Sequence, residues 1–138
     1  MSSYIVTDFQ LSIEEGKLED FKAFVNTMIE ITDANEPNTL VYEWYIHEDG
    51  NECHLLETFK DSDAFMVHLE NVGHLFDRLF ESATMRRAKI YGSPSVELQQ
   101  ALDQLSVEYF AYLNGIERPS KKKTYTEQAR EYARAREG

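Results

Sequence analysis

The sequence predicts an α+β domain with the element order strand, helix, strand, strand, helix, strand. Apolar side chains alternate with a period of two in four short segments and recur every three or four residues in the segments between them. An Asp-Gly pair separates the middle two strands, as expected of a hairpin turn. A chain of 138 residues with 42% hydrophobic content can form one domain with a sizeable core and a tail.

The first strand is expected over residues 4–11, where Ile5, Thr7, Phe9 and Leu11 share one side. Apolar residues at helical spacing then predict a helix from about Glu14 to about Asn35, before Pro37. Residues 40–47 and 54–59 are rich in β-formers and should pair as a hairpin around Asp49-Gly50.

The second helix should begin at Asp61 or Ser62 and continue to Phe80, with Gly73 as a weak point inside it. A fourth strand is expected over residues 84–91. A turn then leads into a third helix with an apolar stripe from Leu98 to Leu113. We therefore divide the chain into a domain over residues 1–95, a helix over 96–116 that packs on the domain or across a dimer, and a polar tail over 117–138.

This order is the ferredoxin-like split βαβ pattern, in which two helices cover one face of a four-stranded antiparallel sheet. The strand over residues 40–47 carries large side chains on both faces, with Tyr42 and Trp44 on one and Val41 and Tyr45 on the other. A single two-layer domain would leave one of these faces exposed. We expect a homodimer that pairs the open sheet faces.

The charge of the chain excludes several classes of partner. A net charge of -11 and a pI near 4.7 argue against nucleic acid and against an anionic membrane surface. The opening residues lack a signal-peptide pattern, and no run approaches the roughly 20 apolar residues that span a bilayer, so a cytoplasmic location is expected. Cys53 is the only cysteine, which excludes an intrachain disulfide and a thiolate metal site within one chain.

The segment EWYIHEDGNECHLLETFKDSDAFMVHL, followed by IYGSPS, resembles the antibiotic biosynthesis monooxygenase (ABM) domain, and especially its quinol monooxygenase branch. The resemblance covers about residues 3–95. It implies a ferredoxin-like fold that dimerises into an α/β barrel with a ligand cavity in each subunit. It also implies oxidation of a phenol or quinol by O₂ without metal or flavin.

His68 is the candidate catalytic residue, because a neutral imidazole can accept a phenolic proton near neutral pH. It lies on or beside the apolar stripe of its helix, where it could equally be a satisfied core histidine. Glu57 needs a partner if it is buried, either Arg86, Arg87 or His54, or a ligand hydroxyl. The expected substrate-binding residues are Tyr42, Trp44, Glu57, Phe65, Phe76 and Phe80, although the aromatic ones also suit a core or an interface.

No metal or cofactor is expected. His74 and Asp77 could join His68, but six residues along a helix turn the two histidines apart by about 240°. A related branch degrades haem, and the resemblance to it breaks down where Arg78 and Phe9 stand near positions that carry a histidine and an asparagine there.

We therefore expect a dimeric, cofactor-independent oxygenase that acts on a small phenol, quinol or similar aromatic molecule with O₂. A non-catalytic or stress-associated ligand-binding dimer is the alternative. A third possibility, a purely structural dimerisation module, predicts no cavity and a space around His68 filled by Phe65, Phe76 and Phe80.

Overall fold

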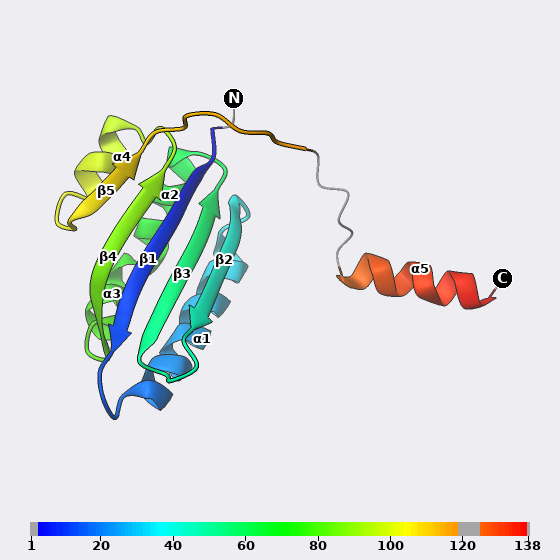
Figure 1. The fold of residues 1–138 in the computed structure, drawn as a ribbon, viewed down its shortest axis with the longest axis horizontal. Helices are drawn as coiled ribbons and strands as arrows, with labels where there is room; N and C mark the ends of the chain where they lie inside the picture. The colour runs from blue at the N-terminus through cyan, green and yellow to red at the C-terminus, as the bar shows by residue number, and fades with distance from the viewer. Residues whose placement is uncertain (1–2, 119–124, 138) are drawn as a thin grey trace.

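The computed structural model describes residues 3–118 and 125–137. Its centre is a five-stranded sheet in the order β2-β3-β1-β4-β5 (Figure 1). The strands are β1 (Ile5–Ile13), β2 (Thr39–Ile46), β3 (Glu52–Phe59), β4 (Ala83–Tyr91) and β5 (Val107–Phe110). The α+β ferredoxin-like class is confirmed.

The prediction of a four-stranded antiparallel sheet was wrong in one detail. The first four strands pair antiparallel, but β5 adds to the edge of β4 in parallel. The third helix, α4 (Val96–Ala101), is therefore much shorter than the expected 96–116. Its apolar stripe continues into Val107–Phe110, whose valine, tyrosine and phenylalanine suit a strand once an open sheet edge lies beside them.

Helical segments cover one face of the sheet (Figure 1). Helix α1 (Leu18–Asn35) begins later than Glu14 because a turn with Gly16 at φ +81° precedes it. The predicted helix from Asp61 to Phe80 is divided into α2 (Ser62–Val72), the 3₁₀ turn η1 (Gly73–Leu75) and α3 (Phe76–Leu79). The break falls at Gly73, which was expected to weaken the helix.

The C-terminal part of the chain carries one more helix, α5 (Tyr125–Glu137). The polar tail predicted over residues 117–138 lies partly outside the described residues, because 119–124 and 138 are not among them. The division of the chain into 1–95, 96–116 and 117–138 stays a prediction. In the described ranges, no helix is both long and apolar enough to cross a bilayer.

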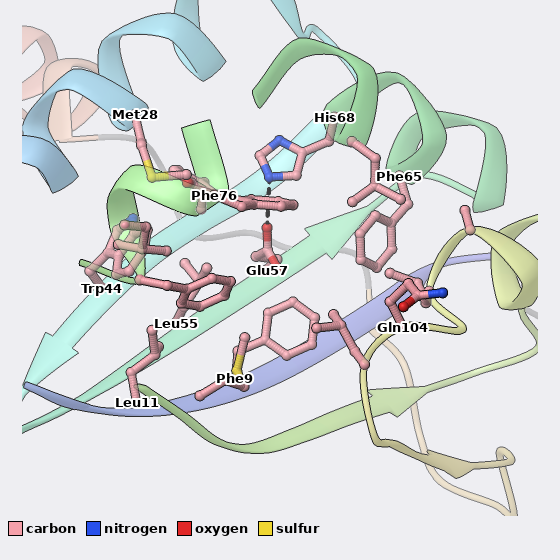
Figure 2. A pocket seen from close by; sticks show the side chains of 18 residues that line it. Phe9, Leu11, Met28, Trp44, Leu55, Glu57, Phe65, His68, Phe76 and Gln104 are labelled. Atoms are coloured by element: carbon pink, nitrogen blue, oxygen red, sulfur yellow. Dashed lines mark ion pairs between the residues drawn. The ribbon is translucent and has the colours of Figure 1, made fainter. Parts of the chain in front are cut away.

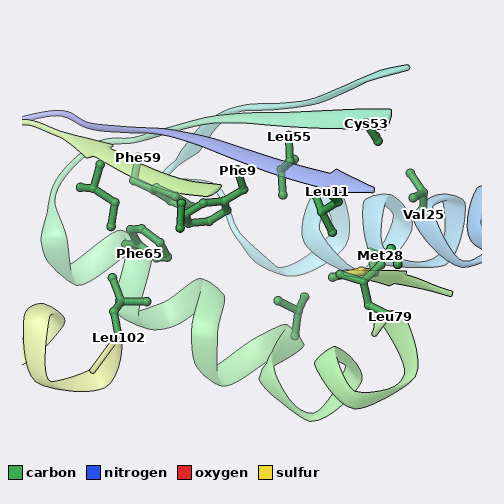
Figure 3. Packing of buried hydrophobic residues seen from close by; sticks show 14 of the residues in the cluster. Phe9, Leu11, Val25, Met28, Cys53, Leu55, Phe59, Phe65, Leu79 and Leu102 are labelled. Atoms are coloured by element: carbon green, nitrogen blue, oxygen red, sulfur yellow. The ribbon is translucent and has the colours of Figure 1, made fainter. Parts of the chain in front are cut away.

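The core lies between the sheet and its helices (Figure 3). The inward side chains of β1 and β3 meet Met28 of α1 and Phe65 of α2. The rings of Phe59 and Phe65 stack with their centroids 4.3 Å apart and are almost completely buried. Strict alternation along β1 leaves every second side chain on the opposite face, where Val6 is 37% exposed.

Candidate active site

A cavity of about 180 Å³ lies between the sheet and the helices. Its walls come from the inner faces of β1, β2 and β3, from α1, α2 and α3, and from the end of α4 with the loop that follows (Figure 2). The lining is almost entirely apolar. The possibility of a purely structural module with a filled interior is therefore contradicted.

His68 lies at the wall of this cavity with both ring nitrogens engaged. Its Nδ1 is 2.7 Å from Glu36 Oε1, and its Nε2 is 3.1 Å from Glu57 Oε2 (Figure 2 marks the second pair). The imidazole is only 3% exposed and each carboxylate 1%. The three residues form a buried carboxylate–imidazole–carboxylate network, which we call the Glu36–His68–Glu57 network.

Each carboxylate is placed by local structure. Glu36 is the C-cap residue of α1, and its oxygens also accept hydrogen bonds from the Thr39 hydroxyl at 2.7 Å and the Asn71 amide at 2.6 Å. Glu57 lies opposite Thr7 in the register of β1 and β3, and the Thr7 hydroxyl donates to Glu57 Oε1 at 2.8 Å. These bonds hold both carboxylates toward the ring.

The protonation state of the His68 imidazole follows from this arrangement. Burial alone would lower the pKa of His68, but the hydrogen bonds and negative charges of Glu36 and Glu57 outweigh it and raise the pKa to about 9. Burial raises the pKa of Glu36, but the bonds from His68, Asn71 and Thr39 outweigh it, so that this pKa is lowered overall. At neutral pH the ring is therefore an imidazolium, held between the carboxyl groups of Glu36 and Glu57.

This state differs from the neutral imidazole base that the sequence suggested. A ring that is already protonated, with both nitrogens hydrogen-bonded, cannot take a substrate proton directly. The oxygens of Glu57 keep unused acceptor capacity toward the cavity, because each carboxylate oxygen has two lone pairs. Glu57 is thus the member of the network that lines the cavity and has free acceptor positions.

Two polar groups in the cavity wall have no protein partner. Tyr42 and Trp44 share a face of β2, with ring centroids 5.7 Å apart and planes at 89°. The Tyr42 hydroxyl and the Trp44 indole nitrogen are buried, and neither has a hydrogen-bond partner in the described part of the chain. They offer two donors to a ligand.

The structure brings all the predicted site residues to one cavity. His68, Tyr42, Trp44, Glu57, Phe65, Phe76 and Phe80 all line it. Their roles toward a substrate stay predictions. The suggested partners of Glu57 were wrong, because Arg86 bonds Ser12, Arg87 bonds Glu108 and His54 bonds Glu52.

Sequence reasoning missed the groups that set the charge of His68. Glu36 is one of 25 acidic residues and stands at the end of a helix, where a glutamate normally meets solvent. Its sequence position before Pro37 marks the helix end but not the partner 32 residues later. Thr7 and Asn71 were missed in the same way.

Comparisons with known proteins agree on one fold. MupZ from Pseudomonas fluorescens is 26% identical, with a TM-score of 0.79 over 88% of this chain and 100% of MupZ. SnoaB, a cofactor-independent oxygenase from Streptomyces nogalater, is 15% identical, with a TM-score of 0.58 over 69% of this chain and 97% of SnoaB. A conserved protein from Methanosarcina mazei is 19% identical, with a TM-score of 0.55 over 63% of this chain and 87% of that protein.

No curated protein matches the sequence. The family model for antibiotic biosynthesis monooxygenase matches residues 4–75, which include every member of the Glu36–His68–Glu57 network. This match spans more than half of the chain. The chain therefore belongs to the antibiotic biosynthesis monooxygenase family.

Proposed function

We propose that this protein is a cofactor-independent monooxygenase that oxidises a small, neutral phenol or quinol with O₂. The observation that supports this most strongly is the Glu36–His68–Glu57 network at the wall of an enclosed apolar cavity. Oxygenation without a cofactor needs a substrate that becomes an electron-rich anion. A buried carboxyl group beside an apolar cavity can remove the proton whose loss gives this anion.

In the proposed reaction, the substrate hydroxyl donates its proton to the Glu57 carboxylate. The His68 imidazolium, 3.1 Å from that carboxylate, stabilises the negative charge that remains on the substrate oxygen. Glu36 holds the ring on its far side. The anion of a quinol then supplies the four electrons that O₂ accepts, so that one oxygen atom enters the ring to give a hydroxyquinone and the other leaves as water. The apolar walls exclude bulk water from the anion.

The size and charge of the cavity restrict the substrate. An apolar cavity of about 150 Å³ is enough to bind benzene, so a cavity of about 180 Å³ suits one ring or two fused rings. The Glu57 carboxyl group in the cavity wall, with Glu36 on the far side of His68, disfavours a ligand that is already anionic. A neutral monocyclic or bicyclic quinol therefore fits best.

Oxygen uptake tests this proposal. Purified protein with a panel of such quinols should consume O₂ above the rate of spontaneous oxidation, and Glu57→Gln and His68→Gln should each lose most of this activity. His54→Gln is the matched control, because His54 is 2.6 Å from Glu52 in an equivalent but solvent-exposed pair. No uptake by the wild type, or an equal loss in the control, would overturn the proposal.

The same panel separates catalysis from simple binding. Quinol binding measured by calorimetry, without O₂ uptake, would favour the alternative of a non-catalytic ligand-binding protein. A cavity with no affinity for any member of the panel would contradict both readings.

We also propose that the active form is a homodimer joined through the open sheet face. Within the described ranges no helix covers this face (Figure 1), and Val6, Leu56 and Tyr45 are 37%, 37% and 53% exposed there. An uncovered apolar sheet face is typical of an interface. Sedimentation equilibrium should find a dimer that Leu56→Asp weakens and Ile29→Asp, on the outer side of α1, leaves unchanged.

A further inference from the structure

Two buried donors lack a hydrogen-bond partner among the residues that the structure describes. Tyr42 and Trp44 place a hydroxyl and an indole N–H in the wall of the cavity. Buried donors are nearly always hydrogen-bonded, and an unsatisfied one costs about 1–3 kcal/mol. Two of them on one strand face call for an acceptor atom supplied by a ligand.

The Tyr42 hydroxyl stays protonated over the working range of pH. Burial raises its pKa far above 10, and the negative charge of Glu57 adds to the effect. The side chains of Thr32 and Trp44, which lie close to the hydroxyl, act in the opposite direction. By distance and angle neither completes a hydrogen bond with Tyr42 among the described residues, so the phenol can donate to a ligand.

The carboxyl group of Glu57 lies beside one of these donors. Tyr42 and Glu57 are direct cross-strand partners in the register of β2 and β3, and both line the cavity. Such partners have Cβ atoms about 5 Å apart. Trp44, the partner of Leu55 in the same register, lines the cavity two residues along the strand. One cavity therefore holds a proton acceptor, held by Thr7 and His68, and two neutral donors on the neighbouring strand.

This combination matches what proton abstraction next to a carbonyl requires. A base must remove the C–H proton, and donors must stabilise the oxygen that becomes negative. The Glu57 carboxylate can supply the first function, and Tyr42 with Trp44 the second. Neither function involves an oxidant.

We propose that the cavity also catalyses keto–enol tautomerisation of a neutral cyclic ketone, an activity that needs no O₂ and goes beyond the proposed oxygenation. The Glu57 carboxylate takes a proton from the carbon next to the carbonyl, and the C–H electron pair forms the new C=C bond. The C=O π electrons move to the oxygen, which accepts hydrogen bonds from Tyr42 and Trp44. Return of the proton to oxygen gives the enol, and its return to carbon restores the ketone.

Hydrogen–deuterium exchange under argon tests this activity with the full chain. The probe is 2-tetralone, a bicyclic ketone with acidic benzylic protons, followed by proton NMR in D₂O. The wild type should exchange these protons at least about tenfold faster than buffer, and Tyr42→Phe should lower the enzymatic rate by on the order of a hundredfold, the usual cost of losing one such donor. Glu57→Gln should abolish it.

Tyr109→Phe is the matched control, because Tyr109, the β5 partner of buried Ile90, is 43% exposed and does not line the cavity. Tyr42→Phe removes only an unpartnered hydroxyl, so it should fold like the wild type, which circular dichroism checks. Exchange no faster than buffer with folded wild type would overturn the proposal. Equal rates in Tyr42→Phe and Tyr109→Phe would also overturn it.

The outcome is independent of the proposed oxygenation. Anaerobic exchange without O₂ uptake from quinols would support the tautomerisation and reject the oxygenase function. O₂ uptake from quinols without anaerobic exchange would support the oxygenase function and reject the tautomerisation.

Discussion

The protonated state of His68 makes a quantitative prediction about stability. Folding raises the pKa of His68 from 6.5 to about 9. A tenfold change in proton affinity is worth about 1.4 kcal/mol, so the charged ring should stabilise the folded state by about 3 kcal/mol. Solvent screening is small, because the ring is only 3% exposed.

The sign of the effect follows from the direction of the shift. Because the folded pKa lies above the unfolded one, the stabilisation is complete below pH 6.5 and is lost as the pH rises through about 9. The Cys53 thiol, whose pKa burial raises from 9 to about 11, reduces stability only above this window. The lowered pKa of Glu36 acts at the other end, where stability is lost as the pH falls below 4.5.

Urea unfolding across this pH range measures the effect, and an NMR titration of the imidazole locates its midpoint. The free energy of unfolding should fall by up to about 3 kcal/mol between the two pKa values of His68. His68→Gln leaves two buried carboxylates without their cation. This should lower the free energy of unfolding by about 3–5 kcal/mol at neutral pH and remove its dependence on pH between 6.5 and about 9. The same pH dependence in this variant as in the wild type, or an imidazole that is neutral at pH 7 in the wild type, would refute the reasoning.

Three further predictions concern the backbone, each checked by urea unfolding. Gly73→Ala should stabilise by about 0.4–1 kcal/mol, since its Cβ would meet nothing within 4 Å and its φ is not positive; a loss would contradict this. Gly92→Ala should destabilise by about 1–3 kcal/mol, because φ is +123° and the new Cβ would lie 2.8 Å from the Tyr4 carbonyl oxygen; a neutral result would argue against strain there. Asp61→Ala should cost about 1 kcal/mol, because Asp61 caps α2 by accepting from the Ala64 N–H at 2.8 Å, whereas Asp63→Ala, in the same turn, should cost less.

The parts of the site that sequence could predict lie on strands and a helix with clear periodicity. Tyr42 and Trp44 are two residues apart on one strand, and the hairpin pairs Tyr42 with Glu57. Alternation alone therefore places all three on one face. His68 follows from the helical spacing after Phe65.

The parts of the site and fold that the sequence could not predict depend on contacts that no local pattern encodes. Glu36 reaches His68 only because α1 and α2 pack side by side, and a helix-terminal glutamate gives no sign of burial. The prediction of one long helix from Val96 onward was wrong for a related reason. Leucine spacing there fits one long helix, but the free edge of β4 stabilises Val107–Phe110 as a strand.

The origin of the cavity walls along the chain has a practical consequence. The ionisable groups and the unpartnered donors all come from residues 7–71, whereas much of the remaining apolar wall comes from residues 76–105. The reacting end and the accommodating end of the cavity are therefore encoded in separate stretches of sequence. Substitutions at Phe80, Met85 or Leu105 can reshape the space available to a ligand while the proton-handling groups keep their positions, which makes the later stretch a suitable target for engineering ligand preference.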